Sequence, residues 1–524
     1  MPDSRCPPAT LLLACTLLAA GSAHARDLRA GLPPIVFVSR TPAAGADAGQ
    51  VPGLGPHGTF VRGSGTLLER ARDGRVRALV ARERMLDVAD PDVSPDGQRV
   101  AFAGIERASA RWRIWVVART GGDLHCVTCD TSAPDMLFDD ADPCWWGDSL
   151  VFASTRAGGH ALYDGTPVTQ LWIRTPNGVL TQLTHEPNGA LDPARDPRSR
   201  RLLFARWWFN PWVSERAHGL TREHARALTP DSVNVWQVVS AALVRDALSA
   251  PALADVRLAA GGVIPRRRGM GVQPALLPGH ELLAVSARNT GLAPRPGTLS
   301  LQRYGAPLSA GVRVAGAAIG DDTGDPYAEN ANLAAPAACA PVALPDGRVL
   351  HALDPSGRGD FGLWLVSGDG ESRALLLDSL GTLELDPAIV FVRRVVRERT
   401  PRSRSKVSAI ICYDDTPPFT YLDTDVFAGA GAPARRAGAH LHVYRLVNPD
   451  SIGQLRDVPV PRTGHIEVEL PADTPLFEQL TDASGRALMS AHGPAQVRGF
   501  NTGAAGTTAR CSGCHLGHSA RPPR

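Results

Sequence analysis

The chain has 524 residues, and its 55 Lys and Arg side chains nearly balance its 52 Asp and Glu side chains, which gives a formal net charge of +3. With 44% hydrophobic and 20% charged residues, the composition is that of a globular protein with ample material for a core. Near-neutral charge spread over the whole length argues against nucleic-acid binding or attachment to an anionic membrane.

Residues 1–25 have the pattern of a signal peptide. An apolar run extends from Thr10 to Gly21, and an A-x-A cleavage site ends at Ala25. The run is too short to span a bilayer, and no later apolar stretch reaches the roughly 18 residues that a spanning helix needs. We therefore expect an exported, periplasmic protein with no transmembrane segment. Lipidation at Cys15 is the rival interpretation, and Leu13 fits a lipoprotein cleavage box poorly.

Residues 26–392 contain a repeat that predicts a β-propeller. Asp/Pro-rich segments precede apolar strands, and the first three copies, at Asp92, Asp142 and Asp192, are 50 residues apart. A strand carrying Trp follows in several copies, for example at Trp115. Such a period with four short strands per unit is typical of propeller blades. The fold class is therefore all-β, with about six blades, and the S-P-D-G turn resembles that of TolB-like propellers.

The repeated aspartates have a simple structural interpretation. An Asp before Pro or Gly caps a tight turn by hydrogen-bonding its own backbone, and we expect this role, rather than ligand binding, for the repeated aspartates Asp90, Asp96, Asp142 and Asp192. The segment from Ser214 to Leu228, within a longer insertion, is expected to be helical.

A basic, proline-containing linker at residues 393–408 separates the propeller from a second domain at residues 409–524. Alternating apolar residues predict strands at Leu441 to Leu446, His465 to Leu470 and Leu476 to Leu480. The second domain is therefore expected to be small and β-rich.

The second domain ends in the sequence Cys511-Ser512-Gly513-Cys514-His515, which is C-x-x-C-H. Two thiols at this spacing can form thioethers with the two vinyl groups of one porphyrin, and the adjacent imidazole can then ligate the iron. The motif predicts one covalent c-type haem, with His515 as an iron ligand, and export agrees with it.

Other interpretations of the motif are a thioredoxin-like redox pair, a plain disulfide or half of a zinc site. A redox pair needs a βαβ setting, which the sequence lacks here. His518 could supply another zinc ligand or a second ligand to the haem iron, so zinc is the alternative metal.

Residues 473–480 and 503–519 resemble the haem-carrying middle domain of the hydrazine synthase alpha subunit, in which a six-bladed propeller precedes the haem domain. The resemblance implies a c-type haem held between the two domains and matches Cys511 and Cys514 to the thioether cysteines. In that family a tyrosine ligates the iron and the motif histidine binds zinc, but Ser519 stands at the tyrosine position here. The chain also stops at Arg524, before a second haem domain, so hydrazine synthesis is not expected.

Several residues are candidates for the sixth iron ligand. Met489, His492, His465, His440 and His442 all lie in the second domain. For each histidine the favoured interpretation is a surface or inter-domain residue. A five-coordinate iron is the other option.

The remaining cysteines have no assigned chemistry. Cys126, Cys129 and Cys144, with His125 nearby, permit either a disulfide or zinc, and a disulfide within this trio is expected for an exported protein. Cys339 and Cys412 either pair with each other or stay buried thiols.

The sequence has no G-x-S-x-G, P-loop or H-E-x-x-H motif, which argues against a propeller-linked serine hydrolase, a P-loop nucleotidase and a zinc protease of these types. We therefore expect a monohaem c-type protein in electron transfer or haem-based redox chemistry, with a periplasmic redox partner. The competing hypothesis is a propeller scaffold protein with a structural haem or zinc at the C-x-x-C-H site.

Overall fold

The computed structural model describes residues 28–511, and its larger internal gaps lie at residues 130–136, 210–233, 245–250, 261–269, 288–298, 306–310, 318–334, 393–418, 472–475 and 496–507. Shorter gaps interrupt several other loops. In the part of the chain that is described, no helix has the length and apolar character needed to cross a membrane.

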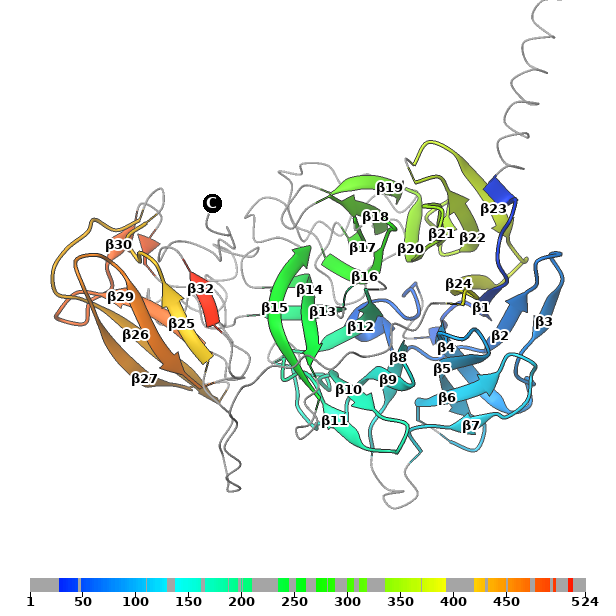
Figure 1. The fold of residues 1–524 in the computed structure, drawn as a ribbon, viewed down its shortest axis with the longest axis horizontal. Helices are drawn as coiled ribbons and strands as arrows, with labels where there is room; N and C mark the ends of the chain where they lie inside the picture. The colour runs from blue at the N-terminus through cyan, green and yellow to red at the C-terminus, as the bar shows by residue number, and fades with distance from the viewer. Residues whose placement is uncertain are drawn as a thin grey trace, which may run out of the picture.

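In the described part of the chain, six four-stranded antiparallel sheets are arranged around a central axis (Figure 1), which confirms the predicted propeller of about six blades. From the axis outward, blade 1 contains β24 (Leu383–Ile389), β1 (Ile35–Arg40), β2 (Gly65–Arg70) and β3 (Val76–Ala78). Blade 2 contains β4 (Met85–Val93), β5 (Arg99–Glu106), β6 (Arg113–Ala118) and β7 (His125–Cys126). Blade 3 contains β8 (Asp140–Trp146), β9 (Ser149–Ser154), β10 (Gln170–Arg174) and β11 (Leu180–Gln182).

Blades 4 to 6 follow the same order. Blade 4 contains β12 (Ala190–Arg195), β13 (Arg201–Phe209), β14 (Asn234–Val244) and β15 (Ala252–Ala260). Blade 5 contains β16 (Met270–Leu276), β17 (Leu282–Ala287), β18 (Leu299–Tyr304) and β19 (Val312–Gly316). Blade 6 contains β20 (Ala337–Ala343), β21 (Val349–Asp354), β22 (Gly362–Val366) and β23 (Arg373–Leu377).

Blade 1 closes the ring, because its innermost strand comes from the far end of the propeller sequence. β24 pairs antiparallel with β1, so residues about 350 positions apart share one sheet, as in the pair Ile35 and Ile389. Each innermost strand contacts the innermost strand of the next blade, and β24 contacts β4. The pairing of β24 with β1 joins the two ends of the propeller sequence and closes the ring.

Every innermost strand bends at a residue that precedes proline. At these six positions the register with the neighbouring strand shifts, and the residue has a positive φ of 48–51°. The six residues are Asp90, Asp142, Asp192, Gln273, Ala340 and Asp386. Proline cannot donate to a strand ladder, so a β-bulge at the X-Pro pair accommodates it without a lost hydrogen bond.

The prediction that the repeated aspartates cap turns is therefore wrong for Asp90, Asp142 and Asp192, which lie within innermost strands. It is correct for Asp96, whose Oδ1 accepts the backbone N–H of Gln98 (3.0 Å). The tight turn of the first copy comes later, where the backbone N–H of Gly97 donates to the carbonyl of Ser94 (2.8 Å). The aspartates that precede proline lie on strands because the bulge needs a residue that tolerates positive φ.

The loop between β1 and β2 reaches the axis of the propeller. It contains the one-turn helix α2 (Gly55–Gly58), and its Val51 and Leu54 are buried in the same apolar cluster as residues from blades 3 to 6. The Nε2 group of Gln273 on β16 lies 3.4 Å from the carbonyl oxygen of Gly53 in this loop. Blade 1 therefore contributes a segment that packs across the ring.

The described residues of the second unit form two three-stranded sheets and one short hairpin. Its strands are β25 (Phe419–Asp423), β26 (Ala439–Asn448), β27 (Ser451–Val460), β28 (Ile466–Leu470), β29 (Leu476–Thr481), β30 (Met489–Ser490), β31 (Gly493–Pro494) and β32 (Thr508–Cys511). The sheet orders are β28-β25-β32 and β27-β26-β29. Its apolar core includes Leu441, Val443 and Leu480, each completely buried.

The outcome for the cysteines is mixed. Cys126 and Cys129 form a disulfide, which confirms the expected pairing within the trio, while Cys144 is buried. Cys339 is a buried thiol in the described structure, and its pKa is well above the usual value because burial disfavours the thiolate. Cys412 and the expected helix from Ser214 to Leu228 lie outside the described residues.

Candidate functional site

The C-x-x-C-H motif begins at the last residue of β32. This strand pairs in parallel with β25, so the backbone of Cys511 lies opposite that of Asp423, a completely buried residue. Cys514, His515 and His518 lie outside the described residues, so their roles as thioether and metal ligands remain predictions. The described structure thus fixes where the motif starts, at the end of an ordered strand of the second unit.

The sequence-derived candidates for a sixth iron ligand are dispersed. The side chain of Met489 is 64% exposed on the hairpin, and His465 is exposed in the turn before β28. His492 lies outside the described residues. His440 and His442 share strand β26, and their side chains are less exposed than those of Met489 and His465 and lie beside a carboxylate.

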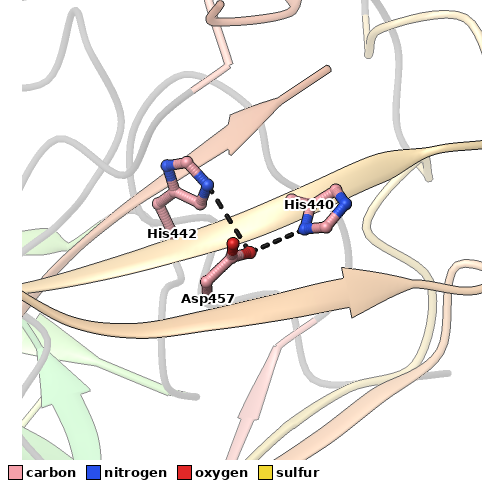
Figure 2. A group of neighbouring side chains, drawn as sticks. All are labelled: His440, His442 and Asp457. Atoms are coloured by element: carbon pink, nitrogen blue, oxygen red, sulfur yellow. Dashed lines mark hydrogen bonds and ion pairs between the residues drawn. The ribbon is translucent and has the colours of Figure 1, made fainter. Parts of the chain in front are cut away.

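Strand alternation places His440 and His442 on the outer face of their sheet. The neighbouring Leu441 and Val443 are completely buried in the core of the second unit, so the side chains of His440 and His442 point the other way. Asp457, on the adjacent strand β27, pairs directly with His442 in the register. Figure 2 shows the carboxylate of Asp457 between the two imidazole rings.

The three side chains form a compact group. Nδ1 of His440 lies 2.6 Å from Oδ1 of Asp457, and Nε2 of His442 lies 3.5 Å from the same oxygen (Figure 2). The other ring nitrogen of His442, Nδ1, lies 3.3 Å from the hydroxyl of Tyr444. Among the described residues, this is the group of three metal-ligating side chains whose ligand atoms all lie within 4.8 Å of one another.

A second concentration of polar groups lies on the propeller axis, at the six bulges. Oδ2 of Asp142 accepts the backbone N–H of Asp192 (3.1 Å), and Oδ2 of Asp192 accepts that of Gln273 (2.9 Å). Oε1 of Gln273 then accepts the backbone N–H of Ala340 (2.8 Å). Each side chain thereby connects its blade to the next. Ala340 has no side-chain acceptor to continue the series.

The axial aspartates have strongly shifted acidities. Burial raises the pKa of Asp142 and of Asp386 to about 6. Burial also raises the pKa of Asp90, with a further contribution from the charges of Asp386 and Asp142, and it raises the pKa of Asp192 in the same way. Four carboxyl groups around one axis therefore favour a partly protonated state.

A cavity of about 440 Å³ lies beside the β1–β2 loop, between this loop and blades 2 and 3. Its wall includes His57, Arg111, Asp139 and His160. Nη1 of Arg111 lies 3.1 Å from Oδ2 of Asp139, and the backbone N–H of Asp139 donates to the hydroxyl of Thr155. Arg111 and Asp139 therefore already have partners within the wall.

Sequence reasoning missed two features of these sites. The six axial positions share one local signal, a residue before proline in each repeat, which the divergent copies at Gln273 and Ala340 also keep. Asp457 had no such signal, because only the strand register brings it opposite His442.

No known protein-family model matches the chain. No curated protein sequence matches it either.

The fold is similar to that of hydrazine synthase from Kuenenia stuttgartiensis, with a TM-score of 0.63 and 15% identity over 94% of this chain and 70% of that chain. Two propeller structures also align: a TolB-like protein of Agrobacterium tumefaciens (TM-score 0.29, 13% identity, 68% of this chain and 93% of that chain) and the propeller domain of the trilobed protease of Pyrococcus furiosus (TM-score 0.32, 11% identity, 64% and 80%). At these identities the likeness concerns the fold, and the two lower TM-scores support no further argument.

Proposed function

We propose that this chain is an exported protein that carries one covalent c-type haem and acts in electron transfer or haem-based redox chemistry. The observation that carries the proposal is the C-x-x-C-H motif from Cys511 to His515. The signal-peptide pattern of residues 1–25 supports it, because the oxidising periplasm is where bacteria attach this haem.

The donor set of the motif fits the group. The thiols of Cys511 and Cys514 would form the two thioether bonds, and the imidazole of His515 would ligate the iron. Strand β32, held in its sheet by β25, would give the first cysteine a fixed backbone position. When bound, the haem would supply an iron that changes between ferric and ferrous states, which is the chemistry of electron transfer.

The similarity in fold to hydrazine synthase supports a relationship for the whole chain, because 94% coverage extends beyond the propeller into the second unit. Within that relationship we propose the middle haem domain of the alpha subunit as the counterpart of residues 409–524. Ser519 stands where that family has its tyrosine ligand, so we propose that His515 is an ordinary axial ligand of the haem iron. We also propose that the protein exchanges electrons with a redox partner in the periplasm and does not synthesise hydrazine.

The test is the intact mass and the pyridine haemochrome spectrum of the chain, exported in a host with c-type haem maturation. We expect the mass of one haem added to the mature chain and a c-type spectrum. Both should be lost in the double variant Cys511→Ala/Cys514→Ala.

The chain offers a matched control in its other C-x-x-C sequence, Cys126 to Cys129, which forms a disulfide and has no following histidine. The variant Cys126→Ala/Cys129→Ala should keep the haem. A wild-type chain that leaves the same host with its apo mass, with zinc or with a disulfide at Cys511 and Cys514, would show that the proposal is wrong.

A further inference from the structure

We propose that His440, His442 and Asp457 bind a divalent first-row transition-metal ion, with zinc as the expected ion. The site lies on the outer face of the sheet β27-β26-β29, and none of its ligands belongs to the C-x-x-C-H motif. It is a second metal site, independent of the proposed haem.

The backbone already orients the ligands toward one point. His440 and His442 are two residues apart on β26, so both side chains leave the same face of the sheet. Asp457 is the direct cross-strand neighbour of His442 and the diagonal neighbour of His440, which pairs with Pro459. Two imidazoles and one carboxylate therefore converge from two adjacent strands whose register is set by the sheet.

The distances are close to those that a metal ion requires. Ligand atoms about 2.0–2.1 Å from a tetrahedral zinc lie roughly 3.3 Å from each other. Nε2 of His442 and Oδ1 of Asp457 are 3.5 Å apart, which already matches. Nδ1 of His440 and the same oxygen are 2.6 Å apart, and a side-chain movement of less than 1 Å would open this pair to the required separation.

Tyr444 provides the outer contact that a ligating histidine usually has. If Nε2 of His442 ligates the metal, Nδ1 carries the proton, and this N–H faces the hydroxyl oxygen of Tyr444 at 3.3 Å. A hydrogen bond from the second ring nitrogen fixes the tautomer and the ring orientation of a metal-bound histidine. Tyr444 is therefore a positioning residue of the site.

The donor set also selects the ion. Imidazole nitrogens suit zinc and copper, whereas calcium and magnesium take oxygen ligands almost exclusively. The side chains of His440, His442 and Asp457 are 29%, 15% and 48% exposed, so an ion can enter from solvent. Three protein ligands leave a fourth position for water or for a ligand from a partner.

The test is zinc binding to the untagged, full-length chain, measured by equilibrium dialysis against a zinc buffer with elemental analysis. We expect one zinc per chain from this site, at least tenfold weaker binding in His442→Ala and in Asp457→Asn, and unchanged binding in His465→Ala, an exposed histidine of the same unit. X-ray absorption at the zinc edge, measured on Cys511→Ala/Cys514→Ala so that the motif contributes no signal, should show nitrogen and oxygen ligands without sulfur.

Two further comparisons show whether the zinc binds at this site rather than at the C-x-x-C-H motif, and whether a variant loses zinc because it loses its fold. Binding should persist in Cys511→Ala/Cys514→Ala, whose iron content is measured separately and tests the haem proposal. In the presence of a chelator, His442→Ala should unfold at the wild-type temperature, because its side chain lies outside the core. Unchanged zinc affinity in both His442→Ala and Asp457→Asn, or a sulfur-containing shell in Cys511→Ala/Cys514→Ala, would overturn the proposal.

Discussion

At the scale of single residues, the axial aspartates are the most unusual feature of the propeller. Asp142 is 7% exposed, and its carboxylate accepts a backbone N–H from the next blade. The same burial that makes this bond strong also disfavours the negative charge, which raises the pKa of Asp142 to about 6. The axial aspartates therefore connect neighbouring blades, and their contribution to stability depends on whether their carboxyl groups are protonated.

This dependence has a definite sign. A carboxyl group whose pKa is raised in the folded state binds its proton more tightly there than in the unfolded chain, so it stabilises the fold at low pH. The contribution is complete below the unfolded value of about 4 and is lost as pH rises through the folded value near 6. The four aspartates thus oppose the usual loss of stability in acid.

Replacing Asp142 with Asn tests this directly. The amide keeps an oxygen acceptor for the N–H of Asp192 and carries no charge, so we expect Asp142→Asn to stabilise the propeller at pH 8 by on the order of 1–3 kcal/mol. At pH 4.5 the gain should shrink, because the wild-type carboxyl group is then protonated. Denaturant unfolding at both pH values measures the difference.

Asp148→Asn is the matched control, because its side chain is 83% exposed and pairs with Arg99 at the surface. It should change stability little at either pH. An Asp142→Asn variant that is less stable than wild type at pH 8, or equally affected at both pH values, would contradict the interpretation of the ring.

At the scale of elements, one local device recurs in all six blades. An X-Pro pair produces a bulge in each innermost strand and turns a side chain toward the axis, whatever residue stands before the proline. In four blades this residue is aspartate, and Asp and Asn tolerate positive φ better than most residues. Gln273 keeps the hydrogen bond to the next blade, and Ala340 keeps only the backbone shape.

Closure of the ring depends on β24, and Leu385 is the residue to test. Its side chain is 1% exposed and packs in the apolar cluster shared by several blades, while its backbone pairs with β1. Leu385→Ala should destabilise the propeller by about 2–5 kcal/mol. Leu380, fully exposed in the loop before β24, is the control, and Leu380→Ala should leave the thermal unfolding temperature unchanged. Equal effects of the two variants would contradict this role for β24.

At the scale of the whole molecule, the described residues form two separate sets of apolar clusters. One set contains residues between Leu32 and Ile389, and the other contains residues between Tyr421 and Ala495. Units with separate cores can unfold separately, so calorimetry should show two transitions, the larger one from the propeller.

Two buried leucines assign these transitions. Leu441→Ala removes a completely buried side chain of β26 and should lower only the smaller transition, whereas Leu385→Ala should lower only the larger one. A single transition that both variants shift together would show that the two cores unfold as one unit.

The sequence determined the architecture because the repeat is local. Strands with alternating or continuous apolar residues, separated by turns and recurring at intervals of about 50 residues, require little information beyond each segment. Six blades, the β-rich second unit and the disulfide among Cys126, Cys129 and Cys144 were predictable in this way, and the described structure contains all three.

The candidate sites are of two kinds, one formed by consecutive residues and the others assembled from different strands. The C-x-x-C-H motif from Cys511 to His515 is contiguous, so its chemistry can be recognised from the sequence alone. The axial ring and the group of His440, His442 and Asp457 join residues from different strands, and their proximity depends on register and on closure of the ring. Local sequence determines strands and turns, but long-range backbone pairing decides which side chains meet, and only the tertiary structure contains that pairing.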